Sequence, residues 1–167
     1  MLKLKNVPEE LQAAIDEKGY DKLTSVQSLV LDPSNSGKDL LVSSQTGSGK
    51  TLAYGLSISC DGLEEIIDKD NKLKTLIVTP TRELALQVFN ELAWLFSKTS
   101  ITISTAIGGM DIKKERKNIV KGVDLLIGTP GRINDHIRRK TFDLNHLKSL
   151  VLDEADEMLD LGFKQDI

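Results

Sequence analysis

The chain has few cysteines, prolines and aromatic residues, and it lacks long hydrophobic runs. Its 167 residues include one cysteine, Cys60, so no internal disulfide can form. The longest aliphatic runs have about three residues, whereas a membrane-spanning helix needs about 20. No secretory signal pattern follows the first residues. These absences argue against a disulfide scaffold and a membrane protein, and they predict a cytoplasmic location.

Neither sign of charge dominates the chain. The 22 basic and 25 acidic residues give a net charge of −3, which excludes a uniformly basic nucleic-acid coat but allows local anion sites. Apolar residues make up 40% and charged residues 28%, with 12 glycines and 4 prolines, so collagen-like and disordered chains are excluded. The composition and length predict one ordinary folded domain.

Short aliphatic runs predict the strands. They lack polar alternation, as expected of parallel strands covered on both faces. The four runs are residues 40–42, 76–78, 125–127 and 150–152, and residues 101–107 are a fifth candidate.

Helical patterns lie between the runs. An apolar stripe follows Pro80, a first helix is expected between Pro8 and Gly19, and residues 61–74 predict a helix-and-loop excursion. Strands alternating with helices predict an open, mostly parallel α/β sheet with helices on both faces. Ligands of such sheets bind beyond the carboxyl ends of the strands, so functional residues are expected just after each run.

A glycine-rich segment follows the first run and precedes a predicted helix. Its glycines let several backbone N–H groups face inward, the helix N-terminus adds partial positive charge, and Lys50 supplies a full one. Thr51 can then hold a magnesium ion. The segment therefore predicts a phosphate-binding loop rather than a flexible turn. The residues assigned to it are Thr46, Gly47, Ser48, Gly49, Lys50 and Thr51.

Two acids, Asp153 and Glu154, end the fourth run. Beside a phosphate loop, one carboxylate can hold hydrated magnesium while its neighbour orients and deprotonates an attacking water. Taken alone, the pair would be read as a helix N-cap followed by a favourable acid. The phosphate loop favours the catalytic interpretation.

Two similar segments, residues 79–82 and 129–132, each follow a strand and open a helix. Arg82 and Arg132 oppose the helix dipole there, which costs about 0.3–1 kcal/mol each unless an anion lies nearby. Both segments therefore predict receptors for a nucleic-acid backbone, unless the arginines pair with local acids such as Glu83 or Asp135. The residues assigned to this contact are Pro80, Thr81, Arg82, Thr129, Pro130, Gly131 and Arg132, with Gly108 and Gly109 bringing further N–H groups to the same polyanion.

Tyr20 and Gln27 precede the phosphate loop. The amide of Gln27 offers a donor and an acceptor that match the edge of adenine, and Tyr20 could stack on its ring. Without further context, ordinary structural roles are the stronger interpretation of both.

Together these segments resemble the first RecA-like domain of the DEAD-box ATP-dependent RNA helicases. The resemblance covers essentially the whole chain, with residues 1–28 as the Q-motif region and 29–167 as the phosphate-loop core. Six motifs occur in the family's order. They are the Q motif at 19–27, motif I at 44–51, motif Ia at 80–85, the GG motif at 108–109, motif Ib at 129–132 and motif II at 153–156.

The resemblance implies an ATP hydrolase that remodels RNA duplexes, with ATP and Mg²⁺ as cofactors. It implies that Gln27 reads adenine, that Tyr20 packs on it, and that Glu154 activates water. Lys50 with the loop would hold the phosphates, while Thr51 and Asp153 would position magnesium. The backbone of RNA would be contacted with little sequence preference.

The resemblance also implies a second RecA-like domain. The sequence stops before the family's Ser-Ala-Thr motif, which Asp156 would contact and whose strand would lie between those of motifs I and II. We therefore expect a fragment of a longer protein, nearly inactive alone because the second domain supplies arginine fingers worth about 10³–10⁵ in rate.

Two other functions stay open at this point. One is a non-catalytic RNA-binding or assembly module that keeps the helicase fold, although intact Lys50, Asp153 and Glu154 argue against it. The other is a GTP-dependent switch, suggested by residues 71–74, in which Lys74 stands where a guanine-reading acid is needed.

Overall fold

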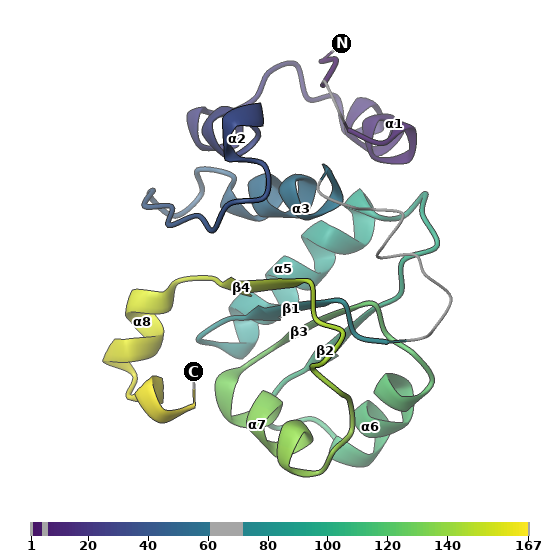
Figure 1. The fold of residues 1–167 in the computed structure, drawn as a ribbon, viewed down its shortest axis with the longest axis vertical. Coiled ribbons are helices and arrows are strands. Elements are labelled where there is room, and N and C mark those ends of the chain that lie inside the picture. The colour runs from purple at the N-terminus through teal and green to yellow at the C-terminus, as the bar shows by residue number, and fades with distance from the viewer. Residues whose placement is uncertain (1, 5–6, 61–71, 167) are drawn as a thin grey trace. The chain divides into compact units, whose positions relative to one another are not determined.

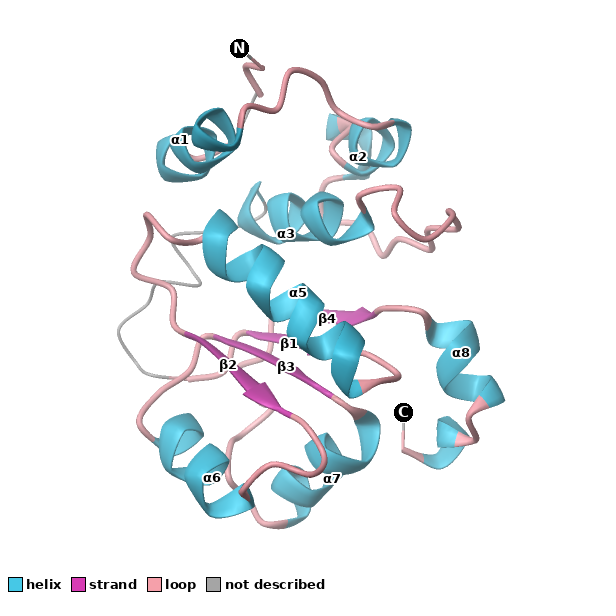
Figure 2. Cartoon of the chain, turned by 180° about the vertical axis from the view of Figure 1, so that it is seen from behind, coloured by secondary structure: helices cyan, strands magenta, loops and turns pink. Residues whose placement is uncertain are grey.

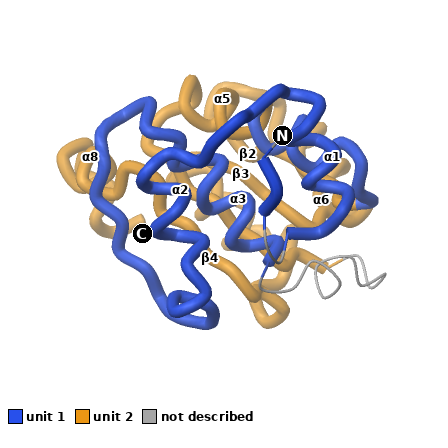
Figure 3. Tube along the Cα trace, turned by 90° about the horizontal axis from the view of Figure 1, so that it is seen from above, with its two compact units in different colours: residues 1–65, 91–100 blue, residues 66–90, 101–167 orange. Residues whose placement is uncertain are grey.

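The computed structural model describes residues 2–4, 7–60 and 72–166. The chain forms two compact units, which are coloured separately in Figure 3. Unit 1 contains residues 1–65 and 91–100, and unit 2 contains residues 66–90 and 101–167. Most of the predicted excursion at residues 61–74 lies outside the described residues.

Unit 1 is helical. Its elements are α1 (Glu9–Lys18), α2 (Ser25–Val30), the short 3₁₀ helix η1 (Pro33–Asn35), α3 (Lys50–Cys60) and the last residues of α5 (Arg82–Leu95). The predicted first helix is confirmed, because α1 begins after Pro8 and ends where Gly19, at φ 73°, donates its N–H to the carbonyl of Asp16.

A close helix contact organises the core of unit 1. A Cβ built on Gly55 of α3 would lie 2.7 Å from Leu92 and 2.9 Å from Leu95, both of which are fully buried. The absence of a side chain at Gly55 thus lets α3 lie close to the end of α5. A smaller buried group, Val26 and Val30 with Ala53, joins α2 to α3.

The strand predicted at residues 40–42 is wrong. These residues have no strand structure, and the side chain of Leu41 is fully exposed. An extended segment becomes a stable strand only when a neighbour hydrogen-bonds to it, and among the described residues none pairs with this one.

A parallel sheet forms the centre of unit 2. Its strands are β1 (Thr75–Val78), β2 (Ile103–Ala106), β3 (Leu125–Gly128) and β4 (Ser149–Leu152), in the order β2-β3-β1-β4 (Figures 1 and 2). These confirm the other four predicted strands. Ile77 of β1 is in register with Ile127 of β3 and with Val151 of β4. The two inner strands, β1 and β3, are buried along their whole length.

The prediction that every run is buried on both faces is wrong for β4. Leu150 is 57% exposed and Leu152 is 42% exposed. The reason is position, because β4 pairs only with β1 and forms an edge of the described sheet.

Helices cover the sheet of unit 2. The first part of α5 lies on one face, while α6 (Ile112–Val120) and α7 (Pro130–Arg138) lie on the other (Figure 2). The predicted stripe after Pro80 is confirmed by the buried Ala85 and Val88. α8 (Ala155–Asp160) and the 3₁₀ helix η2 (Phe163–Gln165) follow β4. Over the described ranges, none of the helices has the length and apolar character required to cross a membrane.

Candidate functional site

The glycine-rich segment of unit 1 forms a tight loop that leads into α3. Gly47 and Gly49 both have left-handed backbone conformations, at φ 77° and 86°, which side chains rarely allow. The hydroxyls of Ser44 and Ser48 lie 2.9 Å apart and close the loop across its base. The loop and the helix after it thus form as predicted, whereas the strand predicted before the loop does not.

Lys50 turns its ammonium group back into this loop. Its Nζ donates to the carbonyl oxygen of Ser44 at 2.8 Å and to that of Gln45 at 3.2 Å. Because Lys50 is also the first residue of α3, its full charge and the helix dipole act in the same place. Thr51 follows it in the first turn, and Thr46 is exposed at the loop tip.

Gln27 ties the Q segment to the phosphate loop. The side-chain oxygen accepts from the N–H of Thr24 at 2.9 Å, which completes a capping box on α2. Its Nε2 donates to the carbonyl of Gly49 at 3.2 Å, and Gln27 is 4% exposed. A Cβ at Gly49 would overlap this amide, so the glycine also provides the space that the contact needs.

Tyr20 stacks on another aromatic residue of unit 1. Its ring centroid lies 6.1 Å from that of Trp94, with 24° between the planes. The ammonium of Lys18 lies over the other ring at 5.2 Å from the Trp94 centroid. Tyr20 remains 41% exposed.

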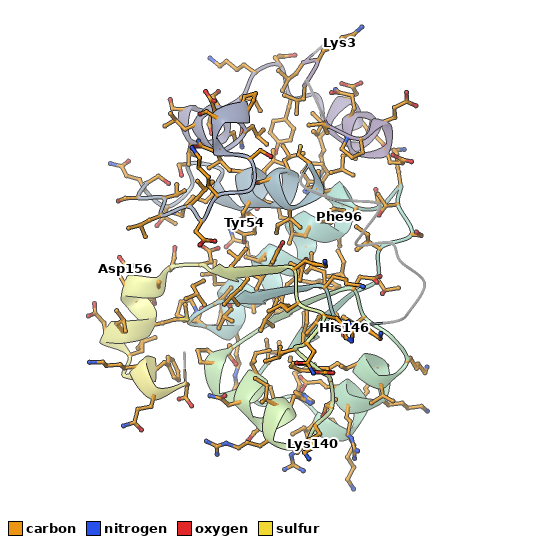
Figure 4. All side chains as sticks on the ribbon, viewed as in Figure 1. Lys3, Tyr54, Phe96, Lys140, His146 and Asp156 are labelled. Atoms are coloured by element: carbon orange, nitrogen blue, oxygen red, sulfur yellow. The ribbon has the colours of Figure 1, made fainter. Side chains whose placement is uncertain are left out.

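The acid pair of unit 2 occupies the turn between β4 and α8. Asp153 is 7% exposed, and its N–H donates to the carbonyl of Val78 at 2.9 Å, which extends the sheet by one bond. Glu154 has φ 53° and ψ 51°, a left-handed conformation that is uncommon for a residue with a side chain. Asp156 is exposed in the first turn of α8 (Figure 4).

The three segments assigned to a nucleic-acid backbone meet in one pocket of unit 2. The pocket has a volume of about 470 Å³ and lies at the carboxyl ends of β1, β2 and β3, as expected for a parallel sheet. Its lining residues are Pro80, Thr81, Arg82, Gly108, Thr129, Gly131, Arg132, Asp135 and Phe163. Gly109 adjoins the lining, and Pro130 is buried in the first turn of α7.

Arg82 packs on the glycine pair. A Cβ built on Gly109, which has φ 83°, would lie 2.6 Å from the Cζ atom of Arg82, and one on Gly108 would lie 3.7 Å from its Nε. Arg82 is exposed, and within the described part of the chain it has no hydrogen-bond or ion-pair partner. Its charge is therefore available to an anion in the pocket.

Arg132 does pair with an acid, but not with either neighbour considered from the sequence. Its Nη1 donates to Oε2 of Glu115 at 3.0 Å, and its Nη2 donates to the carbonyl of Met110 at 3.1 Å. The two side chains of the ion pair are 11% and 9% exposed. The pairing holds the guanidinium at the pocket wall with part of its surface free.

Glu115 and His136 were missed by sequence reasoning. The second oxygen of Glu115 accepts from the N–H of Ile107 at 3.1 Å, and its Oε2 also lies 3.1 Å from Nε2 of the fully buried His136. Nδ1 of His136 lies 3.2 Å from the hydroxyl of Thr141. One signal was present: Glu115 stands on the face of α6 that also carries the buried Ile119, where an apolar residue is expected.

Comparison with known proteins identifies the family of this chain. The sequence matches the family model described as DEAD/DEAH box helicase over residues 24–167. It is 41% identical over 159 residues to the ATP-dependent RNA helicase CshA of Limosilactobacillus reuteri, covering 95% of this chain and 31% of that protein. It is 42% identical over 157 residues to the ATP-dependent RNA helicase RhlB of Vibrio atlanticus, covering 92% and 36%. The chain thus spans about a third of the length of these relatives.

Solved structures show the same fold. A hypothetical ATP-dependent RNA helicase from Sulfolobus tokodaii superposes with a TM-score of 0.83 at 35% identity, covering 95% of this chain and 44% of that one. The yeast DEAD-box splicing factor Prp28 gives 0.85 at 31% identity, covering 99% and 40%. The predicted α/β, RecA-like class is confirmed by these matches. With the motifs in sequence and the fold in common, the chain belongs to the DEAD/DEAH box helicase family.

Proposed function

We propose that this chain is the nucleotide-binding half of an ATP-dependent RNA helicase. The observation that carries the proposal is the loop before α3, where two left-handed glycines curl the backbone around the ammonium of Lys50. Such a loop at a helix N-terminus is built for phosphate. Family membership supports ATP as the nucleotide and RNA as the polymer.

In this proposal the nucleotide is held at both ends. The backbone N–H groups of residues 47–51 and the Lys50 ammonium hold the phosphates, and Gln27 reads the adenine edge. The Gln27 bond to Gly49 places the amide beside the phosphate loop. Because its oxygen already accepts from Thr24 and one N–H already donates to Gly49, the adenine edge would be read by the second N–H and the second lone pair. Tyr20 would pack on the base with its exposed side.

The hydroxyl of Thr51 and the carboxylate of Asp153 fit Mg²⁺ by their chemistry, since both offer hard oxygen ligands. Among the described residues, no three histidine, cysteine or acidic side chains gather as a metal site. A magnesium ion at a nucleotide site is typically held by few protein groups and by the phosphates of its substrate. The ion would neutralise phosphate charge, while Glu154 orients the attacking water and takes its proton.

The pocket of unit 2 is assigned to the RNA backbone. Arg82 supplies an exposed charge without a partner among the described residues, Arg132 supplies a fixed one, and Gly108 brings main-chain groups close. Contacts of this kind recognise phosphates and sugars, so the proposal predicts binding with little preference for base sequence.

Turnover is proposed for a protein that contains a second RecA-like domain as well as this chain. Asp156 would couple motif II to the Ser-Ala-Thr motif, and ATP would favour the closed arrangement of the two domains on RNA. The chain alone is expected to bind nucleotide weakly and to hydrolyse almost none, because an arginine finger supplies about 10³–10⁵ in rate. A cytoplasmic location is part of the proposal.

Binding of a fluorescent ATP analogue tests the phosphate loop. Lys50→Ala is expected to weaken binding about tenfold or more, because a charged hydrogen-bonding partner is lost. Lys38→Ala is the matched control, since Lys38 is exposed in the same unit and outside the loop. Equal affinity of Lys50→Ala and the unaltered chain would refute the proposal, and GTP competing as well as ATP would refute adenine recognition.

Phosphate release separates the helicase from a passive module. In a two-domain protein, Glu154→Gln is expected to preserve ATP binding and abolish RNA-stimulated hydrolysis. A passive RNA-binding module would have no hydrolysis to lose. Robust RNA-stimulated hydrolysis by this chain alone would contradict the role given to the second domain.

A further inference from the structure

Positive charge is concentrated in one segment of this acidic chain. Residues 112–140 contain nine basic and three acidic residues, a net charge of +6, whereas the whole chain carries −3 and the remainder therefore −9. The segment comprises α6, β3, α7 and the two residues after α7. Such segregation is a local electrostatic signal that the overall charge conceals.

Eight of these nine cations are exposed. They are Lys113, Lys114, Arg116, Lys117, Lys121, Arg138, Arg139 and Lys140, which together are called the basic surface below. None of the eight has a side-chain hydrogen bond or ion pair with another described residue. Lys140, labelled in Figure 4, lies just beyond the end of α7.

The three acids of the segment do not neutralise the basic surface. Glu115 is buried against Arg132, and Asp124 accepts from the N–H and hydroxyl of Thr102 at 2.7 and 2.6 Å. Asp135 belongs to the pocket wall. On α6, Lys113 and Lys117 follow each other at a spacing of four residues, an arrangement of like charges that destabilises a helix unless an anion compensates it.

The helices that carry the basic surface, α6 and α7, are joined by side-chain contacts. Oε2 of Glu115 on α6 contacts both Arg132 and His136 on α7, and the helices lie on the same side of the sheet in both views (Figures 1 and 2). The pocket is at the N-terminal end of α7, where Arg132 lines it. The nine residues of α7 span about 13 Å, so the cations at its other end lie within a few nucleotides of the pocket.

We propose that the basic surface is a second contact for the backbone of RNA, which extends from the pocket along α7 and α6. This inference rests on the proposed RNA-binding function of the pocket. It adds a binding surface outside the helicase motifs and predicts that affinity depends on RNA length.

Nucleic acid fits this surface better than an acidic protein or a membrane. A stable protein interface needs several apolar anchors. The helices α6 and α7 expose one large apolar side chain between them, Val120, which is too few for such an interface. A membrane-surface helix needs an open apolar face, whereas Ile119 and Glu115 turn that face of α6 into the core. Closely spaced cations without apolar anchors instead match a polyphosphate backbone.

RNA length and salt test the surface directly. Single-stranded RNA of about 6 nucleotides is compared with RNA of about 20 nucleotides, since a short strand covers little more than one site. Two double variants, Lys113→Gln with Lys117→Gln and Arg138→Gln with Arg139→Gln, are compared with the exposed control pair Lys3→Gln with Lys38→Gln. Circular dichroism checks that each variant is folded.

The unaltered chain is expected to bind the longer RNA more tightly. Each double variant should weaken binding of the longer RNA several-fold and reduce its salt slope by about 0.7 for each lost phosphate contact. The effect on the short RNA should be smaller, because a short strand in the pocket reaches only part of the basic surface. The control pair should change neither. Circular dichroism of the free chain should be the same in all variants.

The outcomes separate this inference from the function on which it rests. If the short RNA does not bind but the longer RNA binds through the eight cations, the pocket assignment fails and the basic surface stands. If the short RNA binds and the longer RNA gains nothing, or if the double variants behave as the control pair does, the inference is overturned. Preference of the surface for a poly-glutamate peptide or for anionic vesicles over the longer RNA would overturn it as well.

Discussion

Glu115 and Arg132 form a buried ion pair, with Oε2 of the acid 3.0 Å from Nη1 of the arginine. They lie 17 residues apart in sequence, on different helices. The same carboxylate also contacts the backbone N–H of Ile107 and the ring of His136. One side chain therefore fixes the glycine turn after β2 and the first turns of α7, which are two walls of the proposed RNA pocket.

Glu115→Ala is expected to destabilise unit 2 strongly. It removes the partner of a largely buried guanidinium and an acceptor for a buried N–H, and breaking one side of a buried pair typically costs about 3–5 kcal/mol. Urea unfolding measures the loss. The exposed acid Glu10 provides a control, since Glu10→Ala should cost less than about 1 kcal/mol.

Glu115→Gln gives a second reading if the alanine variant does not fold. Glutamine keeps the shape and one acceptor oxygen but loses the charge. The urea midpoint of Glu115→Gln is therefore expected to lie between those of the unaltered chain and of Glu115→Ala. An alanine variant as stable as the unaltered chain would show that the pair does not hold the pocket together.

Gly109→Ala is expected to impair RNA binding more than folding. The new methyl group would collide with the guanidinium of Arg82, which must then leave the glycine pair. Gly37→Ala is the matched control, because Gly37 also has a positive φ, 69°, but no neighbour within 4 Å of a built Cβ. RNA affinity at fixed salt should fall at least several-fold for the first variant relative to the second, and equal affinities would exclude a role for Arg82 on the glycine pair.

Tyr20→Ala is expected to change the fluorescence of Trp94, the single tryptophan. Loss of the stack should lower stability by about 0.5–1.5 kcal/mol, whereas Tyr20→Phe keeps the ring contact and should change little. If Tyr20 also packs on adenine, Tyr20→Ala will weaken binding of the ATP analogue while Tyr20→Phe will not. Unchanged nucleotide affinity in both variants would show that Tyr20 stacks on Trp94 but does not bind adenine.

Asp143 is expected to titrate below the usual range of an aspartate. The backbone N–H of Asn145 donates to its carboxylate at 2.9 Å and lowers the pKa, with smaller help from the Asn145 side chain and from the charges of His146 and Lys72. A lowered folded-state pKa stabilises the fold above the ordinary value, and the contribution disappears as pH falls through the folded pKa. NMR titration should show that Asn145→Ala raises the pKa only in part, because the main-chain donor remains; a full return to the ordinary pKa would contradict this assignment.

Many features of this protein could be predicted from the sequence, because they depend on local conformational preferences. Helix α1 ends at Gly19 because a left-handed turn needs glycine, and the phosphate loop closes around Lys50 because two glycines precede a helix. The strands β1 and β3 follow from short aliphatic runs, and their parallel order brings Thr81 and Gly131 to one edge of the sheet. Each of these features depends on neighbours within a few residues, or on the rule that parallel strands share a carboxyl edge.

Other features were decided only by the tertiary structure, because they depend on contacts between residues that are distant in the sequence. Residues 40–42 have the same aliphatic character as β1 but form no strand, because hydrogen-bonding partners and not composition make a strand. Arg132 finds Glu115 rather than its neighbour Asp135, since packing of α6 on α7 buries the former and leaves the latter exposed. Sequence spacing therefore determined which groups this chain carries after each strand, while burial between helices determined which charges are neutralised and which remain for a ligand.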